Sequence, residues 1–66
     1  MEIYIWQFRT KKKLSLCQLE ELTGISKSTI NNLENAKTSP TLRELELLAK
    51  AMDCKIVDLF DSDYKI

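Results

Sequence analysis

The sequence contains no histidine, one glycine, one proline and two cysteines among its 66 residues. Without histidine the chain lacks the usual general base and the commonest metal ligand, which argues against catalysis and metal binding. Cys17 and Cys54 are too few for a disulfide scaffold, and they form no zinc-binding spacing. We therefore expect no enzyme, no metal site and no cofactor.

Long hydrophobic runs are also missing. No apolar stretch approaches the roughly 20 residues that cross a bilayer, and the apolar start of the chain lacks the basic residues and cleavage site of a signal peptide. Hydrophobic residues still make up 44% of the chain, which excludes a disordered tail. We expect one soluble, cytoplasmic domain over residues 1–66 with free thiols, no membrane partner and no evident small-molecule ligand.

Net charge is also absent, because ten basic residues balance ten acidic ones. The balance is uneven along the chain. Residues 1–43 carry seven basic and four acidic residues, whereas residues 44–66 carry three basic and six acidic ones. Zero net charge therefore does not exclude a nucleic-acid partner for the first part, although it predicts weaker non-specific binding than a basic domain would show.

What is present is a helical pattern. Apolar spacing of three and four residues predicts an all-α bundle of five short helices. The expected helices lie at about 5–12, 16–23, 27–34 or 35, 42–52 and 56–60, followed by an acidic tail at 61–66. The starts of the second and fourth helices have capping-box spacing, Ser15 with Gln18 and Thr41 with Glu44.

The second and third helices are separated by a very short connection that contains the single glycine, Gly24. Glycine accepts the left-handed backbone that such a turn requires. The apolar residues Leu19, Ile25, Ile30 and Leu33 are spaced to lock the two helices at a steep angle. This pattern predicts a helix-turn-helix over about residues 15–35.

A motif in and around this helix-turn-helix consists of Thr23-Gly24-Ile25-Ser26-Lys27-Ser28-Thr29-Ile30 followed by Leu33-Glu34, together with Leu14-Ser15, Leu19, Ser39-Pro40 and residues 48–52. On these residues the sequence resembles the lambda-repressor-like family, also called XRE or Cro/CI-type. The resemblance covers about residues 5–60. It implies a compact five-helix domain whose third helix enters the major groove of DNA. The implied function is sequence-specific binding to double-stranded DNA by a small bacterial or phage transcriptional regulator that acts as a repressor.

The resemblance also implies particular site residues. Carried onto this chain, the base-contacting residues are Lys27, Ser28, Asn31 and Asn32. The phosphate-contacting residues are Ser15, Asn35, Lys37, Thr38 and Thr41, where loop side chains and helix starts fix the register on DNA. Arg9 and Glu34 match a pair that the family uses structurally.

Some residues depart from the family pattern. Leu16 stands where many members carry a glutamine. Glu20 stands where a small residue is usual, so either its carboxylate turns outward, toward Lys27, or the two helices splay slightly. Lys13 and Ala36 stand where glycines are common in the family, so each is expected to adopt left-handed backbone at a cost in conformational free energy.

Two partner hypotheses remain open. Tyr4, Trp6, Leu22 and Leu47 exceed what the core needs, and if clustered they would mark a face for a homodimer, at least on DNA. Alternatively, the domain is a protein-interaction helix-turn-helix module, such as an antitoxin, with secondary DNA binding.

Overall fold

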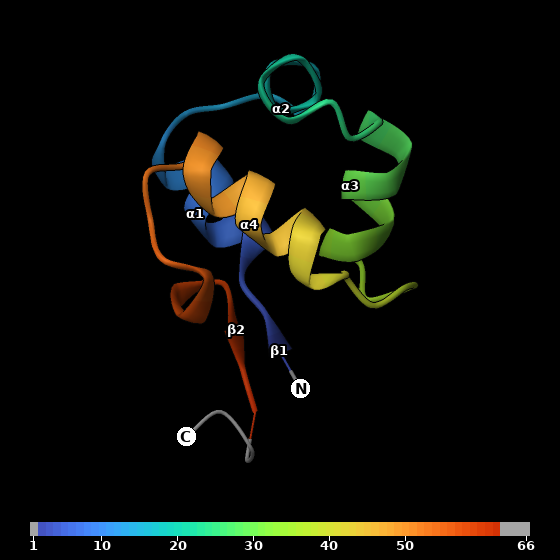
Figure 1. The fold of residues 1–66 in the computed structure, drawn as a ribbon. Helices are drawn as coiled ribbons and strands as arrows, with labels where there is room; N and C mark the ends of the chain where they lie inside the picture. The colour runs from blue at the N-terminus through green and yellow to red at the C-terminus, as the bar shows by residue number, and fades with distance from the viewer. Residues whose placement is uncertain (1, 63–66) are drawn as a thin grey trace.

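The computed structural model describes residues 2–62, and within them it has four α-helices, one turn of 3-10 helix and a two-stranded sheet (Figure 1). Figure 1 shows α2 end-on at the top, α3 at one side, α4 in front and the sheet at the opposite end from α2. In chain order the elements are β1 (Glu2–Ile3), α1 (Ile5–Lys11), α2 (Leu16–Thr23), α3 (Lys27–Glu34), α4 (Leu42–Ala51), η1 (Ile56–Asp58) and β2 (Phe60–Asp61).

The starts of α2 and α4 have the predicted capping boxes. The Ser15 hydroxyl accepts from the Gln18 N–H at 3.1 Å, and the Gln18 side chain accepts from the Ser15 N–H at 2.8 Å. Thr41 and Glu44 form the same two bonds at 3.1 and 2.9 Å. Each box satisfies two of the donors that a helix start leaves unpaired, which defines where the helix begins.

The helices end in left-handed backbone. Gly24 ends α2 with φ 78°, as the spacing predicts, and three non-glycine residues adopt the same region after the other helices: Lys13 (φ 57°), Ala36 (φ 58°) and Asp53 (φ 52°). After α3, the Lys37 N–H donates to the Asn32 carbonyl at 2.9 Å and the Ala36 N–H to the Leu33 carbonyl at 3.2 Å, the Schellman arrangement. Lys13 and Ala36 therefore adopt the left-handed backbone that was expected at these two positions.

A single buried cluster joins all four helices and the 3-10 turn. Its members are Ile5, Leu19, Ile30, Leu33, Leu45, Leu48, Ala49, Met52 and Leu59. Leu16 and Cys54 are half-buried and pack against this core. Burial, with the nearby Asp58 carboxylate, raises the pKa of the Cys54 thiol. No helix within residues 2–62 is long and apolar enough to cross a membrane.

The predicted fifth helix is wrong. Of this segment, only Ile56–Asp58 are helical, and they form a single turn of 3-10 helix. The Leu59 N–H closes this turn by donating to the Ile56 carbonyl at 3.0 Å. Phe60 instead pairs with Ile3, and Asp61 with Glu2, in an antiparallel ladder. A five-residue helix leaves most of its backbone groups unpaired, whereas the short ladder pairs them and holds the two ends of the described chain together. Of the predicted acidic tail, residues 63–66 lie outside the described residues.

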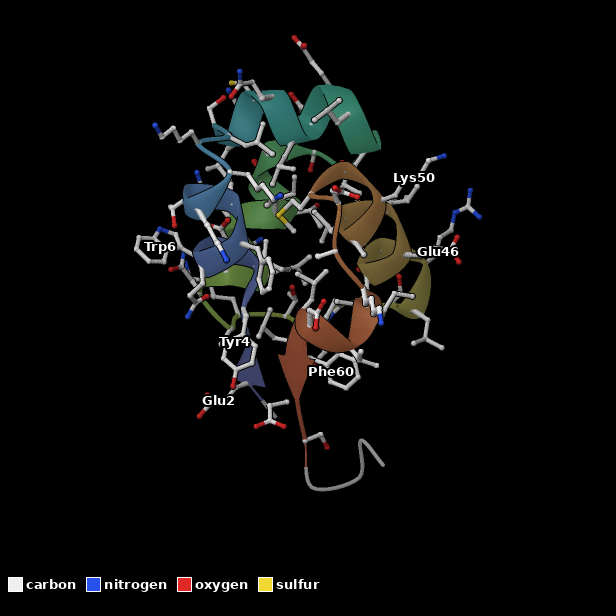
Figure 2. The ribbon with its side chains drawn as sticks, turned by 90° about the vertical axis from the view of Figure 1, so that its left-hand side faces the viewer. Glu2, Tyr4, Trp6, Glu46, Lys50 and Phe60 are labelled. Carbon is white, nitrogen blue, oxygen red and sulfur yellow. The ribbon has the colours of Figure 1, made fainter. Side chains whose placement is uncertain are left out.

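The four apolar residues of the possible dimer face do not share one environment. Trp6 and Leu22 are exposed at 54% and 59%, whereas Tyr4 and Leu47 are half-buried. Figure 2 shows Trp6 at the outer edge of α1 and Tyr4 beside Glu2, whose carboxylate accepts from the Tyr4 hydroxyl at 3.2 Å. Leu42 and Val57 are also exposed. The apolar spacing predicts Leu42 on the core face of its helix with Leu45, Leu48, Ala49 and Met52, and for Leu42 this prediction is wrong.

Candidate nucleic-acid interface

The turn between α2 and α3 is stabilised by Thr23 as well as Gly24. The buried Thr23 hydroxyl donates to the Leu19 carbonyl at 2.7 Å and accepts from the Ile25 N–H at 3.1 Å. This second bond spans Gly24 and fixes the direction in which the chain leaves α2. The sequence interpretation missed this role, because a threonine at a helix end carries no distinct signal.

Helix α3 has two different faces. Ile30 and Leu33 are 0% and 1% exposed in the core, where α3 packs against α2 and α1. The predicted base-contacting residues lie on the rest of the helix: Lys27, Ser28 and Asn31 are exposed, and Asn32 is half-buried. The buried side anchors the helix, and the other side presents a cation, a hydroxyl and two amides to solvent.

The two amides differ in their engagement. The Asn35 side-chain amide donates to the Asn31 side-chain oxygen at 3.2 Å. Among residues 2–62 no hydrogen bond engages the Asn32 side chain. Bidentate pairing with adenine uses both the oxygen and the nitrogen of one amide. Asn32 can offer both without competition from the described residues, whereas the Asn31 oxygen already accepts one bond from Asn35.

The loop after α3 brings Asn35, Lys37 and Thr38 onto the surface, and all three are exposed. The Schellman bonds at Ala36 and Lys37 hold this loop to the last turn of α3. The loop backbone therefore has a defined position relative to the outer face of α3.

The two helix starts expected to contact phosphate are not equivalent. At Ser15 the capping partner is the neutral Gln18, so the positive end of the α2 dipole stays open to anions. At Thr41 the partner is the Glu44 carboxylate, which places a negative charge where a phosphate would approach. Both residues are exposed, but electrostatics favours the Ser15 end for an anion.

Arg9 and Glu34 lie together as a two-point ion pair. Arg9 Nε donates to Glu34 Oε2 at 2.6 Å, and Nη2 donates to Oε1 at 3.1 Å. The third group, Nη1, donates to the Leu14 carbonyl at 3.0 Å. The side chains are only 14% and 5% exposed, so solvent screens the pair weakly. The guanidinium thus joins α1, the following loop and the last residue of α3.

Glu20 turns outward, as its bulk requires, but its partner differs in detail from the expected one. Its Oε2 accepts a hydrogen bond of 3.1 Å from the Lys27 backbone N–H, the first N–H of α3. The first N–H of a helix has no partner within the helix and is therefore free for a side chain that reaches it. Sequence spacing alone points to the ammonium of Lys27 as the opposite charge and does not reveal this backbone contact.

The outer face of α3 thus carries Lys27, Ser28, Asn31 and Asn32, and the 35–38 loop follows directly after this helix. Ser15 and Thr41 lie at the starts of the two helices that flank the core, and α2 packs against both α3 and α4. Within the described residues, no group of three or more cysteine or acidic side chains is placed to hold a metal ion.

Several known proteins are similar to this chain in sequence and in fold. A family model described as helix-turn-helix matches residues 7–59. The HTH-type transcriptional regulator SinR of Bacillus subtilis (strain 168) is 32% identical over 62 residues, which is 92% of this chain and 56% of SinR. The SPbeta prophage-derived uncharacterized HTH-type transcriptional regulator YopS of the same organism is 31% identical over 52 residues, 77% of this chain and 70% of YopS. The chain thus spans about half the length of SinR.

Two solved structures have the same fold. The N-terminal DNA binding domain of SinR from Bacillus subtilis superimposes with a TM-score of 0.80 at 30% identity, covering 91% of this chain and 88% of that domain. The P22 c2 repressor protein, solved in complex with a synthetic operator, gives a TM-score of 0.82 at 27% identity, with 96% of this chain and 100% of the repressor chain covered.

Proposed function

This chain belongs to the lambda-repressor-like helix-turn-helix family, and we propose that it binds double-stranded DNA sequence-specifically as a transcriptional regulator acting as a repressor. The observation that carries the proposal is the two-faced α3, whose Ile30 and Leu33 are buried while Lys27, Ser28 and Asn31 are exposed. In this fold class the second helix of the motif lies in the major groove. Occupancy of an operator would then exclude polymerase by steric hindrance.

Within this proposal the contacts have separate tasks. Lys27 donates to guanine N7 or O6, and Ser28 is compatible with several bases. Asn32 pairs with adenine, and Asn31 beside it contacts a base or a phosphate. Contacts to phosphate fix the register and come from Ser15, Asn35, Lys37, Thr38 and Thr41. Of these, the Thr41 end is the weakest site, because the Glu44 carboxylate lies against it.

Selection from random duplexes, with wild type and Asn32→Ala in parallel, tests the proposal. Wild type should enrich a short motif. Asn32→Ala should lower affinity for that motif by about 1–3 kcal/mol, roughly fivefold to 150-fold, and relax the preference for one base pair. Gln7→Ala is the matched control, because it removes an exposed amide from α1 and should leave the motif unchanged. If neither wild type nor the control enriches any sequence, direct readout is wrong.

We further propose that the chain binds DNA as a homodimer, because one small module buries limited surface on a duplex. Two half-sites about 34 Å apart then follow from the helical repeat of DNA. Light scattering of the protein at high concentration, and of its complex with the selected duplex, measures the stoichiometry. A monomer under both conditions would refute the dimer while leaving the proposed DNA contact in place.

A further inference from the structure

We propose that Glu20 is a specificity-determining residue of this interface, because its carboxylate occupies the N-terminal end of α3 and withholds that end from DNA phosphates. The inference rests on the DNA binding proposed above. It assigns to an acidic residue of α2 the task of suppressing non-specific binding at the end of the recognition helix nearest the bases.

The geometry places the carboxylate at the helix end. Glu20 Oε2 accepts from the Lys27 N–H at 3.1 Å, and the Ser26 hydroxyl accepts from the Thr29 N–H at 3.2 Å. Two of the first three N–H groups of α3 are therefore engaged by side chains of the chain itself. Only the Ser28 N–H between them has no hydrogen-bond partner among residues 2–62.

The positive charge that the backbone N–H groups present at this end is thereby offset, leaving the Lys27 side chain as the cation there. A helix start carries the equivalent of about half a positive charge, which ordinarily attracts a phosphate. A full carboxylate charge in contact with the first N–H outweighs it. A phosphate that approached the Ser28 N–H would meet the Glu20 oxygens at close range, in addition to losing its own hydration.

The start of α2 provides an internal comparison. Its cap consists of Ser15 and the neutral Gln18, with no carboxylate in the first turn. The two helices are of equal length, eight residues each, so their dipoles are similar. The α2 end is thus open to a phosphate, and the α3 end, which carries Lys27 and Ser28, is closed to it.

This difference affects selectivity. Phosphate contacts add affinity for every sequence, whereas base contacts add affinity for one. The N-terminal residues of a recognition helix are those that contact base edges. Excluding phosphate there leaves base contacts as the source of favourable binding free energy at that end, so the ratio of specific to non-specific affinity rises.

Two glutamine variants separate the local charge from its alternatives. Glu20→Gln keeps an oxygen that can accept from the Lys27 N–H and removes the negative charge. Glu21→Gln removes the same charge from the adjacent, exposed position of α2, where no hydrogen bond engages the side chain among the described residues. Both variants should have the same helical circular dichroism signal as the wild type, which shows that they are folded.

The measurement is the dissociation constant on the selected duplex and on an unrelated duplex of equal length, over a salt series. Glu20→Gln should raise affinity for the unrelated duplex about threefold or more, and steepen its salt dependence by up to about one unit. Affinity for the selected duplex should change less, so the ratio falls, and Glu21→Gln should retain the wild-type ratio. An unchanged ratio in Glu20→Gln, or an equal fall in Glu21→Gln, overturns the inference alone. A wild type that fails to discriminate the duplexes overturns the proposed function as well.

Titration of the wild-type protein with inorganic phosphate tests the same inference without DNA or a variant. Amide resonances at the start of α2, Leu16 and Cys17, should shift on addition of phosphate, while those of Lys27 and Ser28 should not. Shifts of equal size and midpoint at Ser28 would show that Glu20 does not close this end, whatever the protein does with DNA.

Discussion

The two ends of α3 are held by different means. At the N-terminal end, exposed polar groups make the contacts: the Ser26 hydroxyl and the Glu20 carboxylate accept from backbone N–H groups at 3.2 and 3.1 Å. At the C-terminal end, Glu34 is 5% exposed and receives two bonds from Arg9, and a left-handed residue closes the helix.

This difference assigns a separate task to each end. A two-point ion pair with little exposure holds its geometry, and removing one partner strongly lowers the free energy of unfolding. An exposed helix cap contributes only about 1 kcal/mol. The C-terminal end therefore fixes α3 to α1 and to the core. The N-terminal end is held lightly, and its exposed side chains remain available for DNA.

The largest expected effect is that of Arg9→Ala, which breaks the anchored end. The substitution leaves the Glu34 carboxylate buried without its partner, at a cost of about 3 kcal/mol. In a domain of this size the thermal midpoint should fall by about 10 °C or more. Thermal unfolding followed by circular dichroism measures the shift.

Lys50→Ala is the control for this variant, because Lys50 is an exposed cation on α4 without an ion pair among the described residues (Figure 2). Its midpoint should remain close to that of wild type. A midpoint for Arg9→Ala as high as that of the control would show that the pair does not anchor α3.

A smaller effect, of opposite sign, is expected at the same end from Ala36→Gly. Ala36 has φ 58°, a conformation that costs a residue with a Cβ about 1 kcal/mol. Glycine removes this strain but adds freedom to the unfolded chain, so the net gain is about 0.5 kcal/mol. Urea unfolding should show a higher midpoint with an unchanged slope. Gly24→Ala, at φ 78° with nothing within 4 Å of the added Cβ, is the reverse test and should destabilise through strain alone.

The smallest effect is expected from Lys37→Ala, which acts on binding and not on stability. Loss of one phosphate contact should weaken binding uniformly across sequences and reduce the salt slope by about one unit. Thermal unfolding should be unchanged, because the Lys37 side chain is exposed. Affinity measured against salt concentration tests this, and a wild-type slope would remove Lys37 from the phosphate contacts.

Sequence patterns predicted most of the helical part because its signals are local. Ser15 with Gln18, Thr41 with Glu44 and the single glycine each act within a few residues, and the structure has the caps and the turn where the spacing places them. The expected membership of the lambda-repressor-like family is also confirmed.

The parts that were not predicted depend on contacts between distant residues. The fifth helix is replaced by a ladder between Ile3 and Phe60, a pairing that no local pattern reveals. The bond from the Lys27 N–H to Glu20 spans the turn, and the acceptor role of the Thr23 hydroxyl depends on its burial. The candidate base contacts remain predictions, since they depend on a partner molecule.

An NMR titration with the selected duplex tests the central claim most directly. The account predicts the largest shift changes at Lys27, Ser28, Asn31 and Asn32, with intermolecular contacts from these side chains to base protons of the major groove. It also predicts small changes along α4 and the β1–β2 sheet. Shift changes centred on α4 or on the sheet, with α3 unaffected, would contradict the claim that the exposed face of α3 reads DNA.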